Sequence, residues 1–222
     1  MEKKNKIPFI IHQFFKIKKI FEFEDGVIPY ISKTEIENLY PDFKYIFWND
    51  QDIKDFINNQ SQIIIDTYNL LNNENKQYDF FKYLILYEYG GIFIEPNFIP
   101  NLRIPNKLFN KSFVGHKILN KRFGIKDYDG KWILGQSLIM CKKNFYGIKL
   151  IINNIIKTKN SNKVPKIHTG IIKLHKIFVN NKIYNNNNVY IFSYDEINPF
   201  MGRYGIYLIR SEWKFFTDNI IF

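Results

Sequence analysis

A carboxylate and an amide stand two residues apart at the end of a short apolar segment. Glu95 and Asn97 follow the apolar residues 92–94 and precede Pro100. If those apolar residues form a buried strand of an open α/β sheet, both side chains stand outside the carboxyl end of a strand, where such sheets bind ligands. Their oxygens could hold a ligand there. The alternative is a polar turn that closes at Pro100, and the residues alone leave both interpretations open.

Asp79 and Lys82 form a second pair, near the start of the helix expected just before that strand. Residues three apart on a helix are neighbours, so the lysine can pair with the aspartate. An aspartate in the first turn is also stabilised by the helix dipole. Taken by itself, the pair is better explained as a helix-start feature than as part of a site.

Several other kinds of site are excluded. The chain has no Gly-x-Gly-x-x-Gly motif, no Walker phosphate loop and no Gly-x-Ser-x-Gly elbow, which argues against dehydrogenases, P-loop proteins and serine hydrolases. A single cysteine, Cys141, excludes an internal disulfide and a cysteine-rich metal site. The histidines lack the short spacings of a metal site; they are His12, His116, His168 and His175.

The apolar pattern predicts the elements that would position these residues. Ser32 and Glu35 have the spacing of a capping box, which predicts a helix that begins there and ends at Pro41. Asn49 and Asp50 are helix-start residues for the next helix. Gly90-Gly91 would end the helix before Glu95, because a helix C-terminus favours positive φ. Predicted strands are 7–15, 43–48, 92–96, 111–116, 132–141 and 188–194, and predicted helices are 32–41, 51–60, 62–71, 77–89, 145–157 and 169–181. The alternation predicts one α/β domain over residues 1–222, with a mixed, mainly parallel sheet flanked by helices.

Composition indicates a folded chain. The 222 residues are 45% hydrophobic and 18% aromatic, too apolar for a disordered chain. A net charge of +11 would attract phosphates, but lysine, asparagine and isoleucine are used throughout the chain, so we expect no nucleic-acid partner. The apolar run 7–15 is short and polar at His12 and Gln13, and no stretch reaches the roughly 20 apolar residues of a membrane helix. We expect neither a signal peptide nor a transmembrane segment, and a cytoplasmic location.

Several segments, in this order and spacing, resemble the glycosyltransferases of family 32. They are "IPFIIHQFF" at 7–15, "YPDFKYIFWNDQDIKDFI" at 40–57 and "YDFFKYLILYEYGGIFIEPNF" at 78–98. In that family a helix begins with an aspartate and an arginine three residues on, ends at Tyr-Gly-Gly, and leads through a strand into an Asp-x-Asp motif. The resemblance implies a single-domain GT-A (Rossmann-like) fold and a distant likeness to the clostridial glucosylating toxins.

The resemblance also implies catalytic roles for three residues. Asp79 matches the aspartate that binds donor sugar hydroxyls. Lys82 stands where the family has arginine and keeps the charge without the bidentate fork. Glu95 and Asn97 fall on the Asp-x-Asp, which in the family binds the nucleotide's ribose and a Mn²⁺ or Mg²⁺ ion on the diphosphate. Because hard cations prefer charged oxygens, one carboxylate and one amide should bind metal more weakly than two carboxylates.

Further donor-binding residues follow from the same resemblance. His12 and Gln13 stand in the family's opening strand, and Gln136 takes the place of an asparagine near the sugar. "RSEW" looks like the Ser-x-Trp element that closes over the diphosphate, in which Ser211 would bind a phosphate and Trp213 would donate its indole hydrogen.

The function implied is transfer of a sugar, with retention of configuration, from a nucleotide diphosphate sugar such as a UDP- or GDP-sugar to a hydroxyl of a glycan or protein acceptor. One alternative is a degenerate transferase fold that binds a nucleotide sugar or glycan without turnover. Another is a basic nucleic-acid binder, for which the sequence has no recognition motif.

Overall fold

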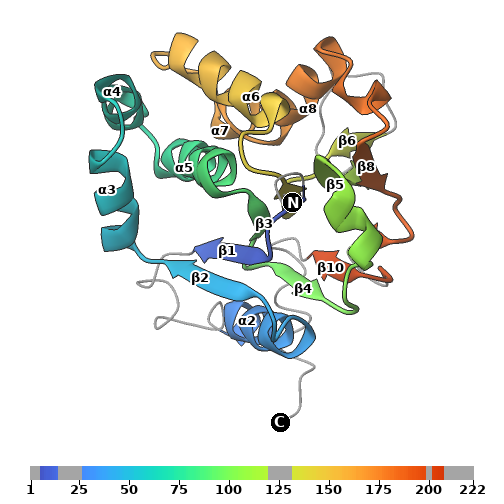
Figure 1. Cartoon of the computed structure of the whole chain (residues 1–222). Helices are drawn as coiled ribbons and strands as arrows, with labels where there is room; N and C mark the ends of the chain where they lie inside the picture. Colours follow the sequence, from blue (N-terminus) through green and yellow to red (C-terminus); the bar gives the residue numbers. More distant parts are fainter. Residues whose placement is uncertain (1–5, 15–26, 120–131, 199–201, 208–222) are drawn as a thin grey trace, which may run out of the picture.

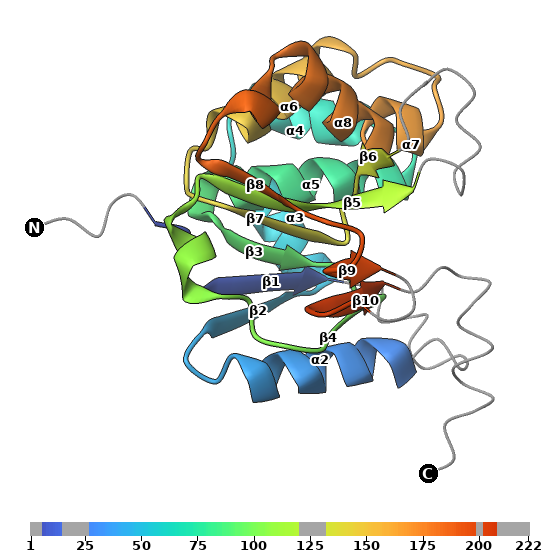
Figure 2. The ribbon, with the colours of Figure 1, turned by 90° about the vertical axis from the view of Figure 1, so that its right-hand side faces the viewer.

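The computed structural model describes residues 6–14, 27–119, 132–198 and 202–207. They form a layered α/β fold in which a central sheet has helices on both faces (Figures 1 and 2). Helices α5, α6 and α8 lie on one side of the sheet and α2 on the other. The predicted mixed sheet flanked by helices is therefore confirmed, but the prediction that it is mainly parallel is wrong, because as many of its pairings are antiparallel as parallel.

The large sheet has the strand order β2-β1-β3-β7-β5-β6, and β8 pairs with the other edge of β5. Three of its six pairings are parallel, namely β1–β2, β1–β3 and β5–β8, and the other three are antiparallel. A second sheet has the order β4-β10-β9. The strands are β1 (Ile10–Phe14), β2 (Lys44–Trp48), β3 (Gly91–Ile94), β4 (Phe98–Pro100), β5 (Phe113–Leu119), β6 (Trp132–Leu134), β7 (Leu138–Cys141), β8 (Val189–Phe192), β9 (Ile197–Asn198) and β10 (Gly205–Tyr207).

The predicted helices begin and end close to the positions that the structure gives them, with one exception, and the short helix α7 was not predicted. The helices are α2 (Val27–Leu39), α3 (Asp50–Asn58), α4 (Gln62–Leu70), α5 (Glu74–Tyr89), α6 (Tyr146–Lys157), α7 (Pro165–His168) and α8 (Ile171–Asn180), with short 3-10 turns η2 (Asn106–Asn110) and η4 (Ile183–Asn185). None of these helices is both long and apolar enough to cross a bilayer, within the described ranges.

The exception is α2, which begins at Val27 rather than at the predicted cap Ser32. Ser32 is fully buried inside the helix, and its hydroxyl donates to the carbonyl of Phe98. The capping-box spacing with Glu35 was therefore misleading, because Ser32 is used for a tertiary contact. Asn49 does cap α3 as predicted: its side chain accepts from the backbone N–H groups of Gln51 and Asp52.

The alternation of side chains along the strands produces two hydrophobic cores. In β3, Phe93 packs with the helices α5, α6 and α8, whereas Ile92 and Ile94 pack with α2 on the opposite face. The same alternation occurs in β7, where Ile139 and Met140 face different cores. Both faces are covered, which explains why these strands are continuously apolar.

The connection from α5 to β3 needs glycine at two successive positions. Gly90 has φ +67° and Gly91 has φ +98°, where other residues are strained. A Cβ at Gly90 would lie 2.5 Å from the backbone nitrogen of Lys143, and one at Gly91 would lie 2.6 Å from the carbonyl oxygen of Ile10. The pair therefore ends the helix and lets β3 enter the sheet directly beside β1.

The predicted strand 132–141 is two strands, β6 and β7, joined by Gly135, Gln136 and Ser137. A Cβ at Gly135 would lie 2.3 Å from the ring of His116, so the chain passes very close to β5 at this point. This break places Ser137 next to the end of β3, where the backbone N–H of Glu95 donates to its carbonyl at 2.8 Å.

Candidate active site

The chain turns sharply just after β3. The N–H of Phe98 donates to the carbonyl of Glu95 at 2.9 Å, which closes a turn over Pro96 and Asn97. The side chain of Glu95 keeps about a quarter of its surface exposed (24%), and its Oε2 accepts from the hydroxyl of Ser137 at 3.1 Å. The two predicted ligand residues thus lie together at the carboxyl end of β3, on a tight turn.

Asp79 and Lys82 lie on the turn of α5 that faces this end of the sheet. Lys82 is only 2% exposed, and its Nζ lies 2.9 Å from Oδ1 of Asp79 and 3.8 Å from Oε1 of Glu95. The ammonium group also lies 5.4 Å from the ring centroids of both Tyr83 and Phe93. The predicted pairing of Asp79 with Lys82 is therefore present and buried, but it is not a helix-start feature, because α5 begins at Glu74 and Asp79 lies beyond its first turn.

Two residues that the sequence did not single out complete this cluster. Thr169, the residue after α7, is fully buried and donates its hydroxyl to Oδ2 of Asp79 at 2.9 Å. Ser137 donates in the same way to Glu95. Each carboxylate is thus oriented by a hydroxyl from a segment distant in sequence. Only the fold shows which atoms these two hydroxyl groups contact.

The two carboxylates can accept hydrogen bonds from a ligand while they are ionised. Burial raises the pKa of Glu95, and the negative charge of Asp79 raises it further, whereas Lys82 and the Ser137 hydroxyl oppose this. Two carboxylates share one ammonium group, so the cluster carries a formal charge of −1 when both are ionised. Carboxylate oxygens with lone pairs left over can accept hydroxyl groups of a sugar.

His12 and Gln13 are not brought to the cluster as donor contacts, contrary to the expectation. His12 is fully buried, its Nε2 donates to the carbonyl of Gly90 at 2.9 Å, and its Nδ1 accepts from the indole of Trp48 at 3.2 Å. Burial lowers the pKa of His12 to about 4, so the ring is neutral at pH 7. Both ring nitrogens are used to hold the Gly90 turn and Trp48.

Gln13 points to the other face of the sheet because successive side chains of a strand alternate. It is fully buried, accepts from the hydroxyl of Tyr45 at 2.7 Å and donates to the hydroxyl of Ser32 at 3.1 Å. Ser32 in turn reaches the carbonyl of Phe98, in the strand that follows the Glu95 turn. Gln13 therefore helps to fix the position of that turn through Ser32.

The remaining predicted residues differ in how far the structure describes them. Gln136 lies in the connection between β6 and β7, beside Ser137, and its side-chain oxygen is buried without a hydrogen-bond partner among the described residues. Ser211 and Trp213 lie outside the described residues.

The described residues fit a divalent cation poorly. They contain no group of three or more His, Cys, Asp or Glu side chains arranged to hold a metal. The turn offers the carboxylate of Glu95 and the amide of Asn97, and the Lys82 ammonium already lies between the two carboxylates. Because a buried ammonium repels other cations, Lys82 opposes metal binding at this cluster.

Comparison with known sequences agrees with this geometry. Residues 28–114 match the family described as a glycosyltransferase sugar-binding region containing a DXD motif. The chain is 29% identical over 153 residues to mannosyl phosphorylinositol ceramide synthase SUR1 of Saccharomyces cerevisiae, over 60% of this chain and 38% of that protein. It is 32% identical over 89 residues to inositol phosphoceramide mannosyltransferase 3 of Schizosaccharomyces pombe, over 40% of this chain and 24% of that protein. The matches thus span less than two fifths of the length of these relatives.

Solved structures show the same fold. The PaToxG glycosyltransferase superimposes with a TM-score of 0.55 at 13% identity, over 82% of this chain and 76% of that one. The family match includes the helix, glycine pair, strand and turn that place Asp79, Lys82 and Glu95. Residues 28–114 are therefore similar to the glycosyltransferase sugar-binding regions that contain the DXD motif, and the described residues have a GT-A fold.

Proposed function

We propose that the protein transfers a hexosyl group from a nucleoside diphosphate sugar to an acceptor hydroxyl, with retention of configuration. The observation that supports this most directly is the cluster of Asp79, Lys82 and Glu95 at the carboxyl end of β3, held by Thr169 and Ser137. In open α/β sheets this edge is where ligands bind.

Asp79 and Glu95 are the residues that we propose to contact the donor. Each carboxylate already accepts a hydroxyl hydrogen bond and is oriented by the ammonium group of Lys82. Fixed acceptors of this kind position a sugar at little entropic cost. Lys82 itself is 2% exposed, so we revise its expected role from donor contact to positioning residue, acting through the two carboxylates.

The relatives suggest which substrates to test first. Their names describe mannosyl transfer and an inositol phosphoceramide acceptor. We therefore propose a mannosyl donor such as a GDP-sugar, ahead of UDP-sugars. As acceptors to test, we propose a hydroxyl group of an inositol phosphoceramide, in addition to the glycan or protein hydroxyl group expected from the sequence. Cytoplasmic location and the absence of a nucleic-acid partner stay predictions.

The direct test is release of nucleoside diphosphate from a panel of nucleotide sugars, each with Mn²⁺, Mg²⁺ or a chelator. We expect turnover with at least one donor, and a loss of about tenfold or more in Asp79→Asn. If turnover survives the chelator, cationic side chains balance the leaving diphosphate; if it needs Mn²⁺, Glu95 and Asn97 bind metal despite the nearby ammonium.

A binding protein without turnover is the alternative, and a specific observation favours it. The chain has Glu-Pro-Asn where the family has its DXD motif, which removes one carboxylate. Calorimetric binding of a nucleotide sugar, together with no product from any donor in the panel, would establish this alternative and refute transfer.

A further inference from the structure

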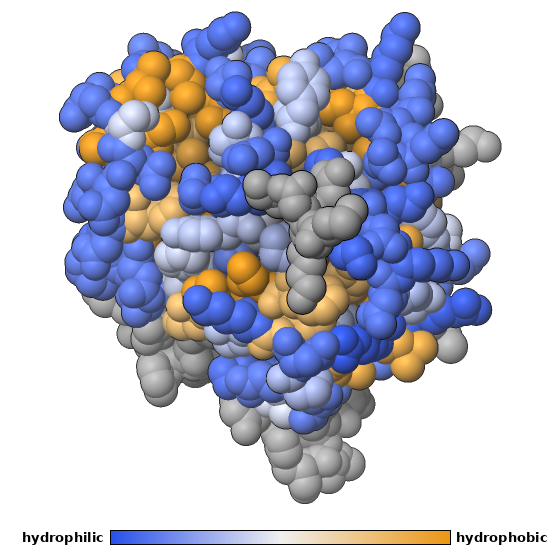
Figure 3. All heavy atoms as spheres, in the orientation of Figure 1, coloured by the Kyte–Doolittle hydropathy of each residue, from blue (hydrophilic) through white to orange (hydrophobic). Residues whose placement is uncertain are grey.

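A second concave surface lies away from the proposed donor site. It is a pocket of about 510 Å³ between β2, α3 and the last turn of α5. Figure 1 shows these three elements around one corner of the sheet, and on the same face of Figure 3 pale side chains of intermediate hydropathy lie among hydrophilic ones. A pocket of this volume is in the range that binds small molecules.

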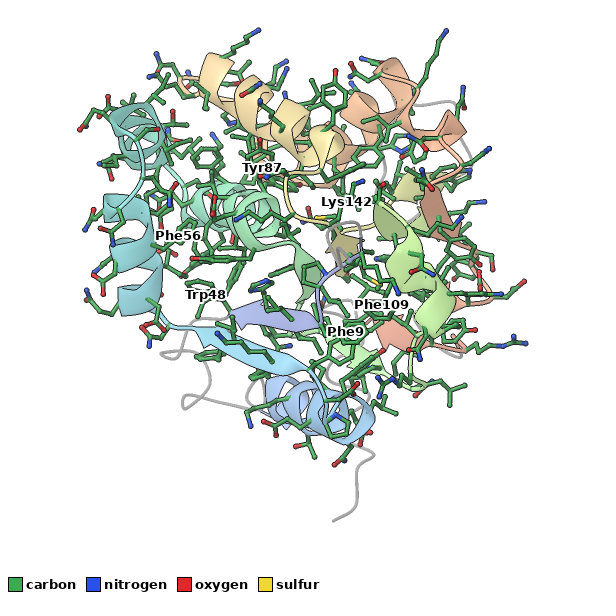
Figure 4. The ribbon with its side chains drawn as sticks, in the orientation of Figure 1. Phe9, Trp48, Phe56, Tyr87, Phe109 and Lys142 are labelled. Atoms are coloured by element: carbon green, nitrogen blue, oxygen red, sulfur yellow. The ribbon has the colours of Figure 1, made fainter. Side chains whose placement is uncertain are left out.

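One wall of the pocket is aromatic. Trp48 of β2 and Phe56 of α3 pack edge to face with ring centroids 5.8 Å apart, and Figure 4 shows both side chains in the space between these elements. Tyr89 of α5 lies 6.1 Å from each of them and is 38% exposed. The indole N–H of Trp48 donates to His12, which fixes the orientation of the ring. The wall is therefore built before any ligand arrives.

All the charged residues of the lining are acidic, and the rest of it is apolar or carries an amide. Asp52 and Asp55 project from α3, Glu88 projects from α5, and none of the lysine, arginine or histidine residues that the structure describes lines the pocket. This runs against the composition of the chain, in which 32 basic residues outnumber 21 acidic ones. Lys143 reaches Glu88 from outside the pocket at 3.1 Å, but both side chains are about half exposed, so solvent screens this pair.

We propose that this pocket binds a small organic cation, through a substituted ammonium or a guanidinium group. Such a cation is attracted to the face of an aromatic ring, and recognition of quaternary ammonium groups by aromatic side chains is a general use of this interaction. The three carboxylates add charge complementarity and repel phosphates. A neutral sugar could stack on the same rings, but it would gain nothing from an excess of negative charge.

The pocket is separate from the donor cluster. Asp79 and Glu88 are nine residues apart on α5, or about 14 Å along its axis at 1.5 Å per residue. The buried ring of Phe81 packs against both Trp48 and Phe56 and belongs to the core behind the pocket. Binding at this pocket can therefore be present or absent whether or not the protein transfers sugars.

The test is a titration of the full chain by NMR with choline and agmatine, beside two neutral probes, 3,3-dimethylbutan-1-ol and methyl glucoside. The first neutral probe has the shape of choline with carbon in place of nitrogen. We expect saturable binding of at least one cation, tighter than either neutral probe and weakened by salt. Glu88→Gln and Asp55→Asn should each weaken it about threefold, and Tyr89→Leu about threefold.

Asp66→Asn is the matched control. Asp66 accepts from Gln62 four residues earlier on α4, as Asp55 accepts from Gln51 on α3, but it does not line the pocket. This control should leave cation binding unchanged. The proposal is overturned if neither cation binds at 20 mM, if a neutral probe binds as tightly, or if both carboxylate variants bind like the original protein. Neither carboxylate variant removes a buried group, so a failure to fold would not obscure the result.

Discussion

Replacing Asp79 with asparagine tests whether the buried cluster has the charges that the structure gives it. Asp79→Asn keeps the size of the side chain but removes its charge. The new amide cannot accept from both Lys82 and Thr169, which now donate to the two oxygens of Asp79 at 2.9 Å each. Lys82 is then a buried ammonium whose nearest carboxylate oxygen, on Glu95, is 3.8 Å away.

The expected loss of stability follows from this geometry. Removing one partner of a buried ion pair costs about 3–5 kcal/mol, because the other charge is left without compensation. Glu95 still provides partial compensation, so we expect the lower end, about 3 kcal/mol. A domain with a typical stability of about 5–15 kcal/mol would remain folded. Adding Lys82→Met should recover part of the loss, because it removes the stranded charge.

The assay is urea unfolding of the single and double variants, with nucleotide-sugar turnover measured on the same samples. Glu37→Gln is the control: Lys33 and Glu37 pair at 2.7 Å but are 43% and 49% exposed, so its cost should be below about 1 kcal/mol. A cost for Asp79→Asn as small as that of the control, or a double variant less stable than Asp79→Asn, would refute the buried pair.

Three further outcomes are expected. Thr169→Val should lower the free energy of unfolding by about 2 kcal/mol and reduce turnover, because Asp79 loses a charge-assisted hydrogen bond. Thr169→Ser should keep both near the original values, and equal turnover in the valine and serine variants would contradict this role. Asn97→Asp should lower the Mn²⁺ concentration needed for half-maximal nucleotide-sugar binding, since it adds a carboxylate beside Glu95; an unaltered titration would mean that residue 97 does not face a metal. Burial lowers the pKa of His12 from 6.5 to about 4, so the unfolded state binds more protons than the folded state in this pH range. The free energy of unfolding should therefore fall as the pH is lowered from 6.5 towards 4, by up to about 3 kcal/mol. In His12→Gln the slope of the unfolding free energy against pH should be smaller, and an identical slope would exclude a buried neutral ring.

Local sequence patterns correctly predicted where several of the helices begin and end. The glycine pair at Gly90-Gly91 was expected to end a helix, and both residues have positive φ. Asn49 was expected to start a helix and forms a capping box with Asp52. These features depend on backbone conformation within a few residues, which residue type controls directly. The short strands β4, β9 and β10 were missed, because two or three residues carry no detectable periodicity.

Predictions from the sequence were wrong where a polar side chain had more than one possible hydrogen-bond partner. Ser32 had the spacing of a cap, but the fold uses it to join Gln13 to Phe98. His12 and Gln13 looked available to a ligand, but both are fully buried and hydrogen-bonded within the protein. A buried polar group must find a partner, and sequence does not show which one is within reach.

By itself, the sequence determined that a carboxylate and an amide follow a buried strand, and that an aspartate and a lysine lie three residues apart on the helix before it. Helix and strand periods are local properties, so these placements needed no knowledge of the fold. Only the tertiary structure decided that the Lys82 ammonium lies between Asp79 and Glu95, and that Thr169 and Ser137 hold the two carboxylates. Thr169 and Asp79 are 90 residues apart in the chain, and packing of α7 against α5 brings them together.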